Sequence, residues 1–589
     1  MTLAGCGING SGRPVIVTDA PRLGLHPETP DASPARPDDA HNNASDLVRL
    51  YLEAAAWANS GATDPRVVQA QQRVQDFLTD DAKKTWQAGA EIRVVQATVG
   101  APVQAGATIR VPVLLRPVGR LTENGEVDVP TDTTAYSQDF MVVQTREGLR
   151  LTNPPPGMLL STDGLQRLYE VHPIYFWDTS DTKLVPDLRY LPRSVEQAKR
   201  PNTVVRWLMP GGPSGWLRPI VQRVPAEFEL ADSVTTDGQK VVVNLSARAA
   251  SQQDKLAHLV IQIRWSLRPL TLPVEVQVAG QRQMISGSSD YLSANPAVPP
   301  TGASEPYRYC VTGGVVHPAE VRGGPPIGLL NSPYDSRVDS AAVFRTQAVA
   351  LVRNVQPGRY ALWLGTADRN SLDATHYVDT GLSTPTMSRP VWLADPKPQV
   401  LVAAGGELYQ ALQGTDGAQI EPVPLPVSGP VTAVAVAPDY RRIAVVAGGT
   451  VYVGLIRVAD TLSVVSLHAV ESGLTERTGV AWSREDRIVV AGRGPTGTGL
   501  VEVSVDGVTV QSLDLTNVAQ TSVSRVVGFP SDPSRGPDGG VPGLMMVEAV
   551  NPAFSTATQS YRVYSHDLTP LHPDNDDGRS CTAPFFVDY

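Results

Sequence analysis

The chain has 589 residues, of which 42% are hydrophobic and 18% charged, and its formal net charge is −10 at pH 7. This length suits about three or four domains, each able to bury its own core. No basic block or basic-aromatic stripe occurs, which argues against nucleic acid as a partner. No run of 18 apolar residues occurs either, so no transmembrane helix is predicted.

The N-terminal stretch is expected to be unstructured. Residues 6–44 are punctuated by proline, with serine, aspartate, asparagine and alanine between, and they show no apolar periodicity. Such a segment cannot bury enough surface to order itself and behaves as an extended spacer. We therefore predict a linker over residues 6–44.

Residues 45–160 are expected to form a small α+β domain. Apolar residues at helical spacing begin at Leu47, and Asp64-Pro65 supplies an N-cap and a proline at the first position of a second helix. From Ile92 the period changes to that of strands. Helices followed by an antiparallel sheet predict a sheet curved around helices, a cone-like architecture as in the nuclear-transport-factor-like (NTF2-like) fold.

Residues 161–298 are expected to form a second α+β domain. HPIYFW (172–177) and KLVPDLRYLPR (183–193) are predicted strands. NTVVRWLM (202–209) is apolar enough for a buried helix that stops at the following Pro-Gly-Gly.

The second half of this domain begins with a predicted hairpin whose turn is Asp237-Gly238. A helix is then predicted from Ser251, with Ser251 and Asp254 forming a capping box and a buried stripe of leucine, valine and isoleucine behind them. The segment PVEVQVAG (273–280) is predicted to close the domain as a strand.

Residues 299–589 repeat weakly at intervals of roughly 40 to 50 residues. Each unit contains apolar strands separated by a polar turn, often with a charged pair, and by a glycine-rich turn. Copies begin near Ser340, Ser388, Gly429, Arg477 and Thr521. Such a period is typical of a β-propeller. We count five copies, with room for a sixth. The predicted fold class is therefore multidomain, with two N-terminal α+β domains and an all-β propeller of five to six blades.

Two of the three cysteines lie at the ends of this propeller region. Cys310 opens it and Cys581 nearly ends it. A propeller must join its first and last blades, so these residues lie where the two ends should meet. We expect a disulfide between them, and the alternative is two unrelated buried thiols. A bridge would indicate an oxidising compartment.

The third cysteine, Cys6, has no expected protein partner and follows Leu3-Ala4-Gly5. Leu-Ala-Gly-Cys matches the bacterial lipoprotein signal pattern, in which the cysteine thiol accepts diacylglycerol and becomes the mature N-terminus. Residues 1–5 are then the remnant of a signal, whose charged and apolar regions lie upstream of Met1. Several acyl chains on Cys6 would anchor the linker stably in a membrane. The alternative is a chance match.

With these features the chain resembles the actinobacterial LpqB lipoprotein family over essentially its whole length. The resemblance depends on LAGC, on DLVRLYLEAAA with the following FLTDDAKKTWQ, and on PDLRYLPRS. It depends also on the order of lipobox, small domain, spore-germination-type (GerMN) domain and degenerate propeller. It implies an exported protein that is lipid-anchored on the extracytoplasmic face of the cell membrane.

The resemblance also implies a partner, the extracellular domain of the sensor histidine kinase MtrB. Through the MtrAB two-component system it implies a role in cell-wall homeostasis and cell division. The family offers no catalytic residue, cofactor or metal ligand to transfer, and Cys6 is the one functional residue carried over.

The sequence itself contains little that suggests an enzyme. The nine histidines are scattered, and no pair has metal-ligand spacing. The acidic segment 572–580 lacks the spacing of a calcium loop. We therefore predict no catalytic residue, metal or cofactor.

Two other functions stay open. The first is a peptidoglycan- or glycan-binding protein of the cell envelope, and the second is a propeller-type hydrolase or lyase with paired carboxylates in its funnel. The segment WLMPGGPSGWLRP (207–219) contains two tryptophans. Trp207 is expected in the core, whereas Trp216, in a loop rich in proline and glycine, is a candidate contact for a partner protein.

Overall fold

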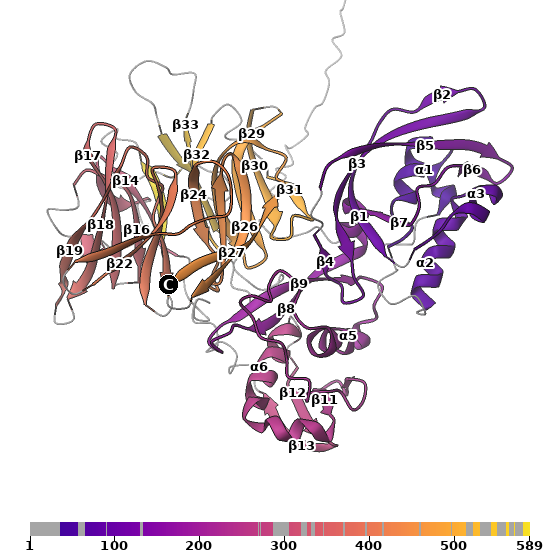
Figure 1. Cartoon of the computed structure of the whole chain (residues 1–589), viewed down its shortest axis with the longest axis horizontal. Coiled ribbons are helices and arrows are strands. Elements are labelled where there is room, and N and C mark those ends of the chain that lie inside the picture. The colour runs from indigo at the N-terminus through magenta and orange to yellow at the C-terminus, as the bar shows by residue number, and fades with distance from the viewer. Residues whose placement is uncertain are drawn as a thin grey trace, which may run out of the picture.

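The chain folds into three parts that lie side by side (Figure 1). The computed structural model describes residues 36–56, 65–89, 91–129, 133–268, 270, 272–286, 306–319, 327–330, 336–345, 347–368, 371–394, 397–414, 417–458, 461–495, 497–513, 522–530, 544–550, 561–564, 571 and 581–588. Two α+β domains precede a strand-rich propeller region. The predicted fold class is thereby confirmed.

The first domain is built on a mixed sheet with the strand order β6-β5-β3-β1-β7, and β2 and β4 pair with β3. A β-bulge between Val94 and Val95 bends β1, which pairs antiparallel with β3 and parallel with β7. The elements are α1 (Ala44–Tyr51), α2 (Pro65–Asp76), α3 (Asp80–Thr85), β1 (Ile92–Val99), β2 (Val103–Ala105), β3 (Thr108–Leu121), β4 (Val127–Asp128), β5 (Tyr136–Thr145), β6 (Gly148–Leu151), β7 (Met158–Ser161) and α4 (Thr162–Leu168).

Residues outside the predicted boundaries of 45 and 160 also contribute to the core of this domain. Ala40, on a short 3-10 helix, and Leu165 and Leu168, on α4, are buried in the same core as α1 and the sheet. Asn43 caps α1, because its side-chain oxygen accepts a hydrogen bond from the Ser45 N–H at 2.9 Å. The same core takes in Tyr190 and Val508 from the other domains, and the boundaries of the domain stay a prediction.

The second domain has two parts, the two-stranded β8–β9 ribbon and a four-stranded sheet with the order β10-β11-β12-β13. The predicted strands at 172–177 and 183–193, the helix at 202–209 and the hairpin all form. The strand β13 was not predicted. The elements are β8 (Tyr169–Trp177), β9 (Leu184–Pro192), α5 (Arg200–Arg206), β10 (Thr235–Thr236), β11 (Val241–Leu245), α6 (Leu256–Ser266), β12 (Val274–Val278) and β13 (Gln281–Ser286).

The predicted capping box at Ser251 and Asp254 is wrong. Residues 247–255 form a 3-10 helix that leads directly into α6, so α6 begins only at Leu256. The Ser251 hydroxyl donates to the Arg248 carbonyl instead of accepting from an N–H of the helix. A preceding 3-10 turn supplies the backbone contacts that a cap would otherwise provide.

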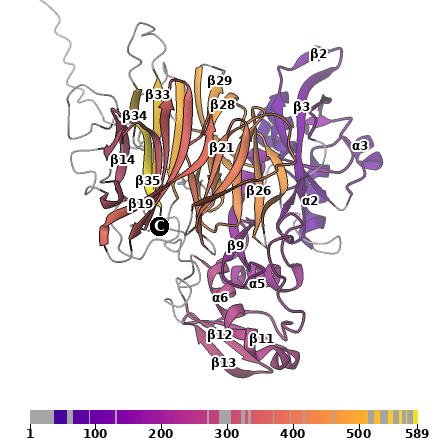
Figure 2. The same ribbon diagram turned by 60° about the vertical axis from the view of Figure 1, so that its left-hand side comes forward.

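The propeller region consists of successive antiparallel sheets that stand around a ring (Figures 1 and 2). In central strands a run of apolar residues is buried, at 443–447 in β25 and 488–491 in β29, since neighbouring blades cover both faces of the strand. Close packing also requires glycine, because a Cβ at Gly528 would lie 2.1 Å from the Trp482 carbonyl oxygen of the neighbouring blade. The five sheets that follow each other along the chain are β16 (Val338–Phe344), β17 (Ala348–Gln356), β18 (Arg359–Asp368) and β19 (Ser371–Thr384); β20 (Val391–Ala394), β21 (Pro398–Ala404), β22 (Glu407–Gln413) and β23 (Ala418–Pro422); β24 (Val431–Val436), β25 (Arg442–Ala447), β26 (Thr450–Val458) and β27 (Leu462–Val470); β28 (Thr475–Arg484), β29 (Arg487–Gly494), β30 (Gly497–Ser504) and β31 (Val510–Ser512); and β32 (Ser522–Phe529), β33 (Leu544–Val550) and β34 (Tyr561–Tyr564).

A sixth blade is assembled from both ends of the propeller region. The last strand, β35 (Thr582–Asp588), pairs antiparallel with β14 (Arg308–Thr312), which pairs with β15 (Val315–Pro318). On its other side β35 meets β16 of the first blade. By hydrogen bonding this unit is continuous with the first blade, in one sheet of the order β15-β14-β35-β16-β17-β18-β19. Counted as a blade of its own, because it packs on blades at both sides, it brings the blades within the described residues to six.

The two propeller cysteines are bonded to each other within this sixth blade. Cys310 lies on β14 and Cys581 directly precedes β35, with their Cα atoms 5.7 Å apart. Both are buried beside Phe586 and Met546. The disulfide thus fastens the strand pairing that closes the ring.

Candidate functional site at the junction of the three domains

The β8–β9 ribbon lies where all three parts of the chain meet (Figures 1 and 2). All nine residues of β9 are buried, although a two-stranded ribbon alone would expose both faces. Leu188 packs into a propeller core, and Tyr190 packs into the core of the first domain. The propeller in turn contributes Val508 to the first core and Leu455 to the second. The domains therefore share their cores at this ribbon.

A buried ion pair joins the end of β8 to the propeller. The Asp178 carboxylate accepts two hydrogen bonds from the Arg441 guanidinium, from Nε at 2.8 Å and from Nη2 at 2.6 Å. It also accepts from the Ser180 hydroxyl and from the Thr182 and Lys183 N–H groups. Although burial opposes its ionisation, the hydrogen bond from Ser180 and the Arg441 charge lower the pKa of Asp178 below its ordinary value.

A second polar contact to the propeller centres on Glu485. Its carboxylate accepts from the Tyr175 hydroxyl at 2.5 Å and lies 3.4 Å from Arg268 Nη2. The Arg268 guanidinium stacks on the Trp265 ring with its central carbon 4.0 Å from the ring centre. Burial raises the pKa of Glu485, and the Arg268 charge acts in the opposite sense.

A third contact links the ribbon to both neighbouring domains. The Tyr190 hydroxyl donates to Asp506 of the propeller at 2.9 Å, and its backbone N–H donates to the Gly125 carbonyl of the first domain at 2.7 Å. Adjacent Arg189 is fully buried and pairs with Asp187 at 2.9 Å. Buried, charge-assisted bonds of this kind fix geometry strongly, because breaking one leaves an uncompensated charge.

Trp216, the candidate contact for a partner protein, is half-buried and meets another domain of the same chain. Its ring packs edge-on against His468 on β27, with the ring centres 5.3 Å apart. The His468 Nε2 lies 2.8 Å from the Val505 carbonyl oxygen. Contact with a separate protein stays a prediction. Trp207 is buried in the core of the second domain, as expected.

The contact between Trp216 and His468 predicts a pH dependence. Burial lowers the pKa of His468 below its ordinary value of about 6.5, so the folded chain favours the neutral ring. The stability that neutral His468 contributes is fully present above the pKa that this residue has in the unfolded chain. It is lost as the pH falls below that value. We expect the urea midpoint of unfolding to fall between pH 7.5 and 5.5. The fall should be smaller in His468→Gln, and an unchanged fall in this variant would contradict the assignment.

Strands β16, β32 and β33 of the propeller carry a cluster of charges with two carboxylates, the kind of pair that the alternative of a funnel enzyme requires. Arg525 on β32 lies 2.8 Å from Asp339 on β16 and 3.4 Å from Glu548 on β33. Burial raises the pKa of Asp339, while the Arg525 charge lowers it. Glu548 is further occupied, since it accepts from the Ala583 N–H of β35. The arrangement joins blades of the ring through one shared arginine.

Some predicted features lie outside the described residues. These are Cys6 with most of the linker, and the acidic segment 572–580. Among the residues that the structure does describe, no three histidine, cysteine, aspartate or glutamate side chains gather as a metal site. In the same part of the chain, every helix is too short or too polar to cross a membrane.

The sequence analysis missed the propeller residues that form the junction. Arg441, Glu485 and Asp506 all lie in turns between strands, at β24–β25, β28–β29 and β30–β31. For Arg441 and Glu485 the available signal is the polar turn of each repeat, which often holds a charged pair, whereas the turn with Asp506 has no such pair. These three residues contact β8 and β9 instead of facing solvent.

Comparison with known proteins agrees with this order of domains. The family model described as "Lipoprotein LpqB, N-terminal domain" matches residues 37–166. The model "Sporulation and spore germination" matches residues 173–283, and "Lipoprotein LpqB beta-propeller domain" matches residues 328–532.

Relatives named Lipoprotein LpqB align over most of the chain. The protein of Cutibacterium acnes is 26% identical and covers 90% of this chain and 91% of its own length. That of Mycolicibacterium smegmatis is 25% identical, covering 76% and 77%, and that of Thermobifida fusca is 25% identical, covering 77% and 81%. With three family models matching in the same order as the observed domains, the chain belongs to the LpqB lipoprotein family.

Proposed function

We propose that this chain is a non-enzymatic lipoprotein, anchored through Cys6 on the extracytoplasmic face of the cell membrane, that acts as an accessory to a sensor histidine kinase. In this proposal it binds the extracellular domain of an MtrB-like kinase and modulates MtrAB signalling in cell-wall homeostasis and cell division. Membership of the LpqB family, over all three domains, is the observation that carries the proposal.

The junction gives this proposal a physical basis. A protein that influences a receptor must present a surface of fixed shape, because mobile domains lose entropy when a partner orders them. Here the β8–β9 ribbon shares cores with both neighbours, and the ion pair between Asp178 and Arg441 is buried. The three domains are thus expected to meet a partner as one body.

The anchor is tested by expressing the full chain, behind a complete signal, in an actinobacterial host. Mass spectrometry of the membrane fraction should find a diacylglyceryl group on Cys6. In a Cys6→Ser variant the protein should appear in the soluble or secreted fraction. An unmodified Cys6 on a protein of the cytosol would contradict the anchor.

The partnership is tested separately, by passing the full-length protein over the immobilised kinase ectodomain. We expect saturable binding at micromolar concentrations, and none to the ectodomain of an unrelated histidine kinase as the control. A protein that is lipidated yet does not bind would refute the kinase partnership while leaving the anchor in place.

A further inference from the structure

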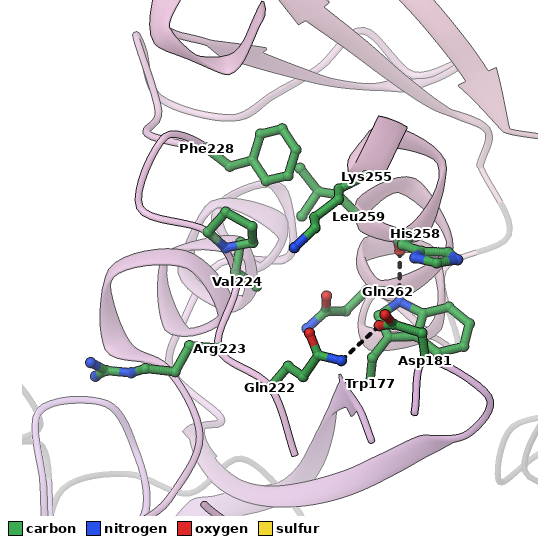
Figure 3. Close-up of a pocket in the computed structure, with 11 residues that line it drawn as sticks. Trp177, Asp181, Gln222, Arg223, Val224, Phe228, Lys255, His258, Leu259 and Gln262 are labelled. Atoms are coloured by element: carbon green, nitrogen blue, oxygen red, sulfur yellow. Dashed lines mark hydrogen bonds between the residues drawn. The ribbon is translucent and has the colours of Figure 1, made fainter. Parts of the chain in front are cut away.

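The pocket beside α6 of the second domain is too small to be a ligand site. It lies between the loop at residues 222–228 and α6 (Figure 3), and it encloses only about 30 Å³, which is room for about two water molecules. The amide nitrogen of Gln222 is already bonded there, to the Asp178 carbonyl at 3.1 Å and to Asp181 Oδ1 at 3.0 Å. A partner therefore needs an open surface rather than this pocket.

The first domain has such a surface, on the face of its sheet opposite the helical core. Among the large apolar side chains that are exposed within the described residues, three belong to strands β2, β3 and β5, namely Val103, Leu114 and Tyr136. Val103 is 46% exposed and Leu114 50%, with all three domains in place. In Figures 1 and 2, β2 lies at the end of the first domain that points away from the β8–β9 ribbon. Clustered apolar side chains that stay exposed mark a contact site for another macromolecule.

The strand register places Val103 and Leu114 on the same face of the sheet. On β3 the odd-numbered residues from 111 to 115 are buried in the core, so Leu114 and the other even-numbered residues point to the opposite face. Val103 stands directly opposite Arg110, and residues paired in this way share a face. We call this face the outer face. Its apolar residues on β2, β3 and β5 are Val103, Ala105, Pro112, Leu114, Met141 and Val143.

The outer face carries no unbalanced charge. Among residues 108–114 of β3 and the residues paired with them, the charged side chains are Arg110 and Asp139, which lie 3.2 Å apart as an ion pair. The hairpin residues 100–109 include no charged and no aromatic residue. Segments that bind a membrane surface use aromatic residues together with lysine or arginine, whereas the centre of a protein interface is poor in charge. The composition therefore favours a protein over a lipid surface.

The outer face is continuous with a contact between domains of this chain. Arg116, the next but one residue after Leu114 on β3, points to the same face, and its Nη1 lies 3.2 Å from Glu471 of the propeller. The face thus ends at the propeller. A protein bound on it would lie against the first domain beside an interface that the chain already uses.

The linker enters the first domain close to the outer face. The 3-10 helix Pro37–Ala40 contacts β6. Val143 of β5 pairs with β6 on one side and, on the other, with Thr108 at the base of the β2–β3 hairpin. In a chain anchored at Cys6, residues 7–35 form a tether that spans roughly 100 Å at most. A protein held in the same membrane therefore stays within reach of the outer face.

We propose that the outer face binds the extracellular domain of the kinase, through an apolar and uncharged segment of that domain. The inference rests on the proposed function and assigns its contact to the first domain. Burial of Val103 and Leu114 supplies the driving force, and the pairing of Arg110 with Asp139 leaves no lone charge to desolvate.

Binding of the kinase ectodomain to the full-length protein tests the inference with two variants and a matched control. Leu114→Glu and Val103→Glu each place a charge on the outer face, and each should weaken binding about tenfold or more. Val315→Glu makes the same change at an apolar residue of the propeller that is 38% exposed, and it should leave the affinity unchanged. The two variants are independent positions on the surface, and thermal unfolding checks that each is folded.

The outcomes separate this inference from the proposed function. Unchanged binding in Leu114→Glu and Val103→Glu, or an equal loss in Val315→Glu, would overturn the inference and leave the kinase partnership in place. A native chain that does not bind the ectodomain would refute both.

Two further measurements decide between the kinase and other occupants of the face. Sedimentation of the native chain as a dimer that Leu114→Glu abolishes would assign the face to a second copy. Binding of the Cys6→Ser chain to phosphatidylglycerol vesicles, lost on adding Leu114→Glu, would assign it to lipid. Either result would overturn the inference, and we expect neither.

Discussion

A double variant with Cys310→Ser and Cys581→Ser is expected to lose up to about 5–6 kcal/mol of the free energy of unfolding of the propeller, because the disulfide closes a loop of 271 residues. In the chain-entropy account a cross-link stabilises by restricting the unfolded chain, and the effect grows with loop length. Hydrogen exchange during urea unfolding, read by mass spectrometry, would separate propeller peptides from those of the other domains.

Reduction provides the control for this variant. With dithiothreitol the native chain should fall to the stability of the double variant, whereas the double variant itself should not change. Equal stability of the oxidised native chain and the variant would show that pairing of β14 with β35 alone closes the ring.

Replacement of Asp178 by alanine should destabilise the docking of the propeller on the ribbon by about 3–5 kcal/mol. Asp178 is 1% exposed and Arg441 is 6% exposed, so the variant leaves a buried guanidinium without its carboxylate. The Thr182 and Lys183 N–H groups lose their acceptor as well. The backbone amides of Thr182 and Lys183 should therefore exchange hydrogen faster in the variant, under conditions in which the propeller stays folded.

The chain offers a matched pair for comparison. Arg110 and Asp139 also form an ion pair, at 3.2 Å, but their side chains are 45% and 43% exposed. Solvent screens such a pair, so Asp139→Ala should cost only about 0–1 kcal/mol. A similar loss of stability in Asp178→Ala and Asp139→Ala would mean that burial does not strengthen the ion pair between Asp178 and Arg441.

Local pattern was enough to predict much of the fold. The repeat of apolar strands and polar turns predicted the propeller, because each blade has the same period. Ring closure by Cys310 and Cys581 followed from the position of the two residues at its ends. The capping box at Ser251 failed because a 3-10 helix and an α-helix differ by one residue in hydrogen bonding, which short side-chain motifs do not distinguish.

The junction could not be predicted from local pattern. Arg441 lies 263 residues beyond Asp178, and Asp506 lies 316 residues beyond Tyr190. The β9 sequence LVPDLRYLP contains an aspartate, an arginine and two prolines, which suggests an exposed edge. The strand β9 is buried only because the first domain and the propeller both pack on it.

The sixth blade also sets the order in which the protein can mature. Its first strands, β14 and β15, leave the ribosome long before β35, which pairs with β14. They pair with each other, but the edge of β14 that β35 covers stays open and prone to aggregate until β35 has been made. Loss of only the final strand would therefore expose the edges of two blades. The disulfide between Cys310 and Cys581 can therefore form only late in assembly, after Cys581 has been made.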